Sequence, residues 1–158
     1  SPLWDWGPHD LAMCLAIMNK LPNKIESSYL KNDISALNHK SNINIKLHFE
    51  KGIYADLNFG NYMKSKYRHF KVNFEDSSLI FDPIHYSNIQ MEINEQIKDY
   101  IYGKSNISSD FDLSPLELLI KEFVEDIFSS NFNLSDLLLS KNVISILESV
   151  DQKLKKSF

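Results

Sequence analysis

A histidine and two carboxylates lie close together within the first ten residues of the chain. Asp5 and His9 are four residues apart, and Asp10 follows directly. A neutral imidazole accepts a proton at neutral pH, and a nearby carboxylate can hold it in one tautomer and orientation. Asp5 and His9 are therefore candidates for general acid–base catalysis. The plainer interpretation is a pair of helix-terminal acids beside a surface histidine.

A helix is expected to hold this pair. Gly7 suits the N-cap and Pro8 suits the first helical position, so the residues before them are expected to form a loop. His9 would then lie in the first turn, where the helix dipole favours the neutral imidazole. Pro22 ends the segment, and its apolar stripe at helical spacing consists of Leu11, Cys14, Leu15 and Met18.

The middle of the chain has the two-residue period of β-strands, which predicts an antiparallel sheet with one apolar and one polar face. Lys51-Gly52 fits the tight turn of a hairpin. The segment 87–112 is polar and has no readable period. Strands are expected over residues 25–30, 43–49, 53–59, 68–75 and 79–82.

The last third of the chain is expected to be helical. Ser114-Pro115-Leu116-Glu117 is a capping box with proline at the first helical position. A second helix is expected over residues 136–154. Both have apolar stripes that predict burial, and the first stripe consists of Leu116, Leu119, Ile120, Phe123, Val124 and Ile127. The whole pattern predicts one α+β domain over residues 1–158, with helices packed on one face of a mostly antiparallel sheet.

Composition excludes several classes of function. The 158 residues carry 17 Lys+Arg and 21 Asp+Glu, a net charge of −4 that argues against nucleic-acid binding. No apolar run is long enough to span a membrane. One cysteine, Cys14, excludes a multi-cysteine metal site and favours a cytoplasmic location. Only four glycines occur, so no glycine-rich nucleotide loop can form.

Other candidate residues have plainer alternatives. Arg68 is the only arginine and suits a phosphate or carboxylate, although an exposed strand residue is the simpler interpretation. Trp4 and Trp6 can line a sugar site or simply pack. His9-Asp10 also fits a metal-dependent phosphohydrolase, but no histidine precedes His9. We therefore expect no metal site.

The segment Asp5-Trp6-Gly7-Pro8-His9, followed by an apolar helix, resembles the D-x-G-x-H motif of the glucose–fructose oxidoreductase/inositol dehydrogenase (Gfo/Idh/MocA) family. The resemblance continues in order along nearly the whole chain. The strands resemble that family's C-terminal sheet, and Lys66 and Arg68 match a Lys-x-Arg before a strand in its nucleotide-sugar dehydrogenases. Residues 114–123 and 136–153 resemble its two last helices.

The resemblance implies a substrate domain of an NAD- or NADP-dependent dehydrogenase that acts on a sugar or nucleotide sugar. It implies catalytic roles for Asp5 and His9, with His9 taking the hydroxyl proton and Asp5 orienting it. It also suggests Trp4, Lys66 and Arg68 as substrate-binding residues. The family's nucleotide-binding domain, its Glu-Lys-Pro motif, and the helix and strand before D-x-G-x-H are missing. We therefore expect a truncated C-terminal portion that binds no cofactor and is inactive by itself.

A partner is expected for the polar face of the sheet, because the helices can cover only the apolar face. Tyr54, Asn58, His48 and His69 interleave the charges there and suit an interface. In the family this open face joins subunits, which implies a homodimer or homotetramer. The alternative function is a non-enzymatic dimerisation or ligand-binding module with the same fold.

Overall fold

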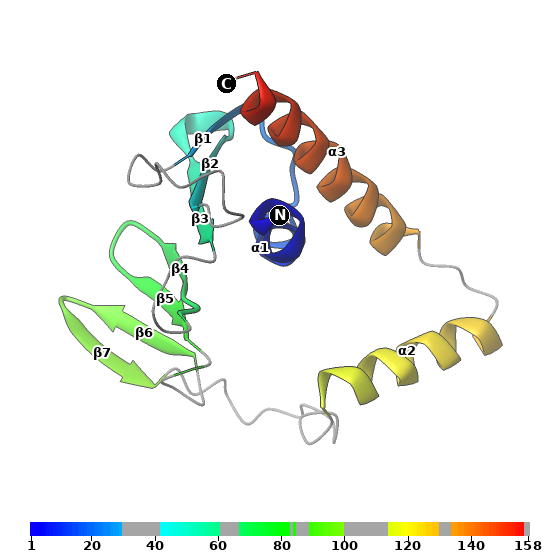
Figure 1. Cartoon of the computed structure of the whole chain (residues 1–158). Helices are drawn as coiled ribbons and strands as arrows, with labels where there is room; N and C mark the ends of the chain where they lie inside the picture. The colour runs from blue at the N-terminus through cyan, green and yellow to red at the C-terminus, as the bar shows by residue number, and fades with distance from the viewer. Residues whose placement is uncertain are drawn as a thin grey trace. The chain divides into compact units, whose positions relative to one another are not determined.

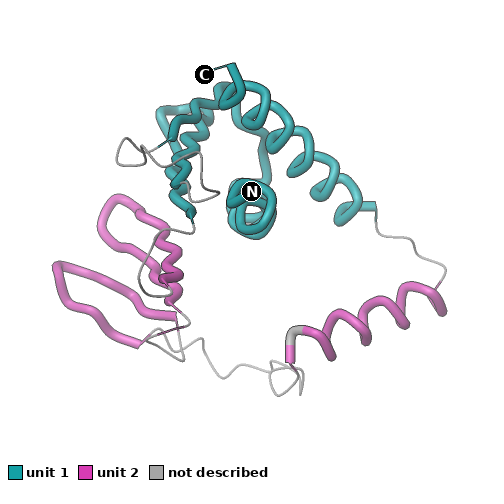
Figure 2. The backbone as a smooth tube through the Cα atoms, in the orientation of Figure 1, with its two compact units in different colours: residues 1–63, 132–158 teal, residues 64–131 magenta. Residues whose placement is uncertain are grey.

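The computed structural model describes residues 1–29, 42–60, 67–82, 84, 89–99, 114–129 and 134–156. Two compact units divide the chain: residues 1–63 with 132–158, and residues 64–131 (Figure 2). Each unit is described by itself. In chain order (Figure 1) the elements are α1 (Pro2–Met18), β1 (Lys24–Tyr29), β2 (Asn42–His48), η2 (Glu50–Gly52), β3 (Tyr54–Gly60), β4 (Phe70–Asn73), β5 (Ser78–Phe81), β6 (Gln90–Ile93), β7 (Gln96–Asp99), α2 (Pro115–Ser129) and α3 (Ser135–Lys155).

The protein is an α+β protein with antiparallel sheets, as the sequence predicts. The strands form two sheets rather than the one expected, a three-stranded sheet in the order β1-β2-β3 and a four-stranded sheet in the order β4-β5-β6-β7. Every strand pair in both sheets is antiparallel. Within the described residues, no helix combines the length and apolarity that crossing a membrane requires.

Helix α1 begins earlier than the sequence predicts. It starts at Pro2 and runs through Pro8, so the expected loop before Gly7 and the expected caps are wrong. Pro8 has no N–H to donate to the carbonyl four residues before it. Leu3 compensates for this lost bond, because it extends the buried stripe by a full turn and is only 1% exposed. The left-handed residue Asn19 ends the helix.

The β2–β3 hairpin has the predicted turn. Lys51 and Gly52 both take positive φ angles, 60° and 77°, in the short helix η2. Ile45 pairs with Leu57 and Ile43 pairs with Phe59. The pairing therefore places all four apolar side chains on one face of the sheet, as the alternating pattern predicts.

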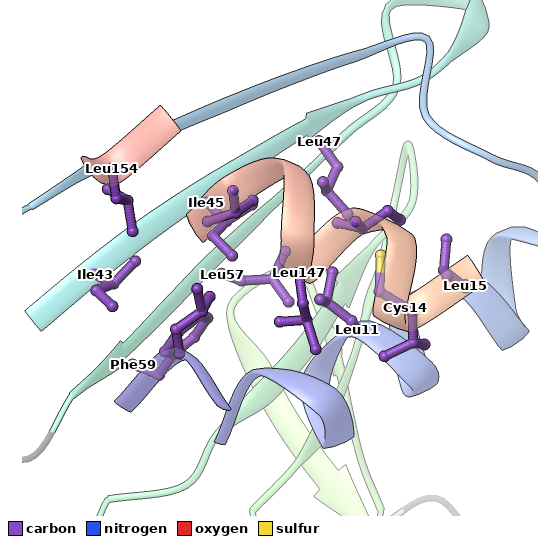
Figure 3. Close-up of a cluster of buried hydrophobic side chains, with 14 of the residues drawn as sticks. Leu11, Cys14, Leu15, Ile43, Ile45, Leu47, Leu57, Phe59, Leu147 and Leu154 are labelled. Carbon is purple, nitrogen blue, oxygen red and sulfur yellow. The ribbon is translucent and has the colours of Figure 1, made fainter. Parts of the chain in front are cut away.

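Helices α1 and α3 cover this apolar face and form the main core of the first unit (Figure 3). Cys14 lies in this core, as predicted, and Leu147 rather than Ile144 completes the buried stripe of α3. The largest fully buried side chains are Leu3, Leu11, Ile43, Ile45, Leu47, Leu147 and Val150.

The second unit contains a β-hairpin in the segment that could not be read from the sequence. Strands β6 and β7 are joined by Asn94 and Glu95, both with positive φ. Such a two-residue turn normally uses glycine, and its absence here hid the hairpin. Helix α2 forms as predicted, but its apolar stripe is not buried: Leu116, Leu119, Ile120, Phe123, Val124 and Ile127 are 43–66% exposed.

Candidate functional site

Asp5 and His9 lie on the solvent-facing side of α1. Measured from buried Leu3, they are about 200° and 240° around the helix, opposite the stripe that contacts the sheet and α3. Both are exposed. Because residues four apart are neighbours on a helix surface, their side chains share one patch. The Asp5 carboxylate is also 3.4 Å from the amino group of Ser1.

The early start of α1 changes the electrostatic setting of this pair. Asp5 lies in the first turn, where its charge suits the positive end of the helix dipole. His9 lies a further turn along, and the dipole effect falls off within the first turn. The expected position of His9 in the first turn of the helix is therefore wrong. An exposed imidazole can still exchange protons freely with a bound molecule.

Gly7 fixes how closely this helix approaches α3. A Cβ atom at Gly7 would lie 2.9 Å from Cδ2 of Leu147 and 3.5 Å from Cζ of Phe59. The missing side chain therefore lets α1 lie directly on α3 and β3. This contact holds Asp5 and His9, on either side of Gly7, on the opposite face of the helix.

Aromatic side chains flank the pair on α1. Trp4 is 41% exposed and Trp6 is 52% exposed, so neither side chain is buried in the core. Trp6 and His9 are three residues apart and therefore adjacent on the helix surface. This region offers a carboxylate, an imidazole and flat apolar surface, which are the groups that sugar-binding sites combine.

Arg68 belongs to the second unit, just before β4, and is exposed. The rings on either side of it, Tyr67 and His69, stack with centroids 6.1 Å apart and an interplanar angle of 21°. Lys66 lies outside the described residues. The structure therefore gathers Trp4, Asp5 and His9 on one helix, and the participation of Arg68 and Lys66 stays a prediction.

Two other titratable groups of the first unit, Cys14 and Glu26, have perturbed pKa values with structural causes. Burial raises the pKa of the Cys14 thiol to about 11, which makes it a poor nucleophile. Glu26 lies 2.5 Å from Lys24 and 3.3 Å from His48. Hydrogen bonds from Lys24 and then His48 lower the pKa of Glu26. Among the described residues, no three His, Cys, Asp or Glu side chains are grouped closely enough to hold a metal ion.

Sequence reasoning missed a hydrogen-bonded cluster on the outer face of the β1–β3 sheet. Asn44 donates to Asp56 at 2.5 Å and to Asn58 at 2.9 Å, and Asn58 donates to Asp56 at 3.1 Å. Beside it, the Lys46 ammonium lies 4.5 Å from the centroid of the Tyr54 ring. The alternation of polar residues in both strands was the available signal, but it does not reveal which side chains bond to each other.

The chain is similar to solved oxidoreductase structures. UDP-N-acetylglucosamine 3-dehydrogenase GnnA from Acidithiobacillus ferrooxidans matches in two crystal forms with TM-scores of 0.73 and 0.76, 14% identity and 94% and 98% of this chain covered. A protein of Magnetospirillum magnetotacticum MS-1 assigned to the oxidoreductases matches with a TM-score of 0.71, 21% identity and 92% coverage. No protein-family model matches the sequence, and no curated protein is similar to it.

The match covers this chain almost completely but only part of each neighbour. The chain spans 45% and 47% of the two GnnA chains and 47% of the Magnetospirillum chain. These neighbours confirm the resemblance noted in the sequence at the level of the fold. The chain has an α+β fold similar to the corresponding portions of these solved structures.

Proposed function

We propose that this chain is the C-terminal substrate-binding and oligomerisation portion of an NAD- or NADP-dependent oxidoreductase that acts on a hydroxyl group of a sugar or nucleotide sugar. The observation that carries the proposal is the Asp5–His9 pair, exposed on one face of α1. The GnnA neighbours, which are dehydrogenases of a UDP-sugar, support the substrate class. In this proposal the two compact units belong to one domain.

His9 is the proposed general base. Its exposed imidazole accepts the proton of the substrate hydroxyl as the carbon that bears it is oxidised. Asp5, one turn earlier on the same face, orients the imidazolium and stabilises its charge. Trp4 would pack against the sugar, and Lys66 and Arg68 would bind its anionic substituents.

The oxidation also needs a hydride acceptor, which the resemblance gives as NAD or NADP. The glycines that the structure describes do not fit such a group. Gly7 is buried in a helix, Gly52 lies in a hairpin turn, and Gly60 ends β3. None of these three opens a helix from a parallel strand, as a dinucleotide site requires. We therefore propose no step of the reaction that uses the cofactor on this chain.

The test replaces His9 in a polypeptide that joins this chain to a nucleotide-binding half. We expect His9→Ala to lower turnover about 10²–10⁴-fold, the usual cost of losing a general base, with cofactor affinity unchanged. Ala16→Gln, on the same exposed face two turns further along, is the control and should keep full turnover. Near-normal turnover in His9→Ala would contradict the catalytic role and favour a non-enzymatic dimerisation or ligand-binding module.

We further propose a homo-oligomer formed through the outer face of the β1–β3 sheet. This face is polar but is internally bonded through Asn44, Asp56 and Asn58, so its groups lose few bonds to water when covered. Tyr54, 60% exposed at the hairpin end of β3, gives it an exposed aromatic ring. We expect Tyr54→Glu to reduce the mass measured by light scattering. An unchanged mass would contradict the proposal that this face forms the interface.

A further inference from the structure

The neighbours of His9 on the surface of α1 are set by helix geometry. Residues three and four positions away on either side lie beside it. They are Asp5, Trp6, Ala12 and Met13. Side chains in a helix slant towards its N-terminus, so the imidazole of His9 lies over the turn that holds Asp5 and Trp6. Among its four neighbours, only Trp6 has a flat ring.

The packing of α1 within its own unit leaves Trp6 on the side that carries His9. Measured from Leu3 at about 100° per residue, Trp6 is about 300° around the helix and His9 is about 240° around it. The two are therefore about 60° apart and about 4.5 Å apart along the axis. The helix packs on α3 and β3 through the other side, where Leu11 and Leu15 are buried.

Trp4 lies elsewhere on the helix. At about 100° it falls between Leu11, at about 80°, and Leu15, at about 120°, on the side that packs against the rest of the unit. It is about 140° from His9, more than twice the angle that separates Trp6 from His9. Trp4 can therefore contact only a part of the substrate that lies away from the imidazole, whereas Trp6 stands beside it.

The chemistry of the proposed reaction places a sugar ring next to His9. A general base lies about 2.6–3.2 Å from the oxygen whose proton it takes, so the carbon that bears this hydroxyl is close to the imidazole. A pyranose ring has hydroxyl groups on its rim and C–H groups on its faces. The indole of Trp6 offers a flat apolar surface to such a face, and Asp5 and His9 beside it offer polar groups to the rim.

We propose that Trp6 is the stacking platform for the sugar ring that carries the reactive hydroxyl. This inference rests on the proposed function, since His9 defines where the hydroxyl lies. The ligand of this platform is a pyranose, either free or as the sugar of a nucleotide sugar, with a C–H face open beside the reactive hydroxyl. The indole and the imidazole hold the ring at two points, which fixes the direction in which the hydroxyl meets the base.

Fluorescence of the 158-residue chain tests this contact, because Trp4 and Trp6 are its only tryptophans. Trp4→Phe leaves Trp6 as the one indole, and Trp6→Phe leaves Trp4. We expect titration with UDP-glucose to change the emission of Trp4→Phe saturably, beyond the change that UDP alone causes at the same concentration. Glucose alone should have the same effect at higher concentrations. The emission of Trp6→Phe should change less.

Kinetics separate sugar binding by Trp6 from support of the helix. In the polypeptide that joins this chain to a nucleotide-binding half, we expect Trp6→Leu to raise KM for the sugar substrate about tenfold, the size of one lost aromatic stacking contact. The value of kcat should change far less. Trp6→Tyr keeps a flat ring and should restore most of the affinity. Ile17→Ala, three turns further along the same side of α1, is the control and should leave KM unchanged.

Three results would overturn the inference. One is an emission change in Trp6→Phe that equals or exceeds the change in Trp4→Phe, which would place the ring beside Trp4. Another is no saturable change in either variant. The last is an unchanged KM in Trp6→Leu, and the proposed function then still stands if His9→Ala lowers turnover. If His9→Ala keeps full turnover, the proposed function fails, and the fluorescence of the chain alone decides whether Trp6 contacts a sugar.

Discussion

Gly7 has a packing role that can be separated from its place between Asp5 and His9. Any side chain there meets Leu147, which is 1% exposed and held in the core. We expect Gly7→Leu to lower the free energy of unfolding by about 1–3 kcal/mol, the usual cost of overpacking. Urea denaturation followed by circular dichroism measures this loss. Ala16→Leu adds the same side chain on the exposed side of α1 and should unfold at nearly the wild-type urea concentration.

Cys14 provides a second prediction at the residue scale. Burial raises the pKa of its thiol from 9.0 to about 11. Between these values the unfolded chain has lost the thiol proton and the folded chain has kept it. Stability therefore falls as pH rises through this window. We expect urea denaturation to show that the free energy of unfolding falls more steeply from pH 9 to 11 in the wild type than in Cys14→Ala. Equal slopes in both proteins would contradict the buried, protonated thiol.

The candidate site shows what residue spacing can predict. Residues four apart share a helix face wherever the helix begins. The predicted proximity of Asp5 and His9 therefore holds, although the predicted start of α1 is wrong. The expected first-turn position of His9 is wrong, because it depended on the exact first residue of the helix. Proline and glycine together suggested a helix start, and only the packing of Leu3 and Gly7 shows otherwise.

At the scale of elements, the capping box holds the beginning of α2. The Ser114 N–H donates to the Glu117 carboxylate at 2.7 Å, and the Glu117 N–H donates to the Ser114 hydroxyl at 3.3 Å. A hydrogen bond between the Ser114 side chain and the Glu117 carboxylate, and then the bond from the Ser114 backbone N–H, lower the pKa of Glu117. We expect Ser114→Ala to speed hydrogen exchange in the first turn of α2 in NMR, at a cost of about 1 kcal/mol.

The pH dependence of that turn has a definite sign. The pKa of Glu117 is lower in the folded chain than its ordinary value of 4.5. Its contribution to the stability of this turn is therefore present at pH values above 4.5 and is lost as the pH falls through the lowered pKa. The first-turn amides should therefore lose protection in acid in the wild type. Ser129→Ala, at the other end of α2, is the control and should behave like the wild type. A similar acid response in Ser114→Ala would contradict this role of the cap.

Alternation and capping predicted most of the elements, but not their partners. The β2–β3 hairpin follows from its period and from Lys51-Gly52, and α2 follows from Ser114 and Glu117. Amphipathic spacing predicts that a face is apolar, and it does not say what covers that face. The stripe of α2, expected to be buried and found exposed, shows the difference.

At the scale of the whole molecule, the described helix N-termini are unsuited to a dinucleotide. A pyrophosphate binds where free backbone N–H groups and the positive end of a helix dipole face it. Here each first turn carries a carboxylate: Asp5 in α1, Glu117 in α2 and Asp136 in α3. Pro2 also removes one N–H from α1. Negative charge at each of these positions opposes a phosphate.

We therefore expect the 158-residue chain to bind neither NAD nor NADP tightly. Calorimetric titration with each nucleotide, oxidised and reduced, should give no binding heat at micromolar concentrations. Asp136→Asn removes the carboxylate at α3, and it should still not bind, because the glycine turn that brings the backbone close to a pyrophosphate is also missing. Micromolar binding by the wild-type chain would show that these residues form a nucleotide site in some other way. The proton-transfer role of His9 would then have to be reconsidered together with that site.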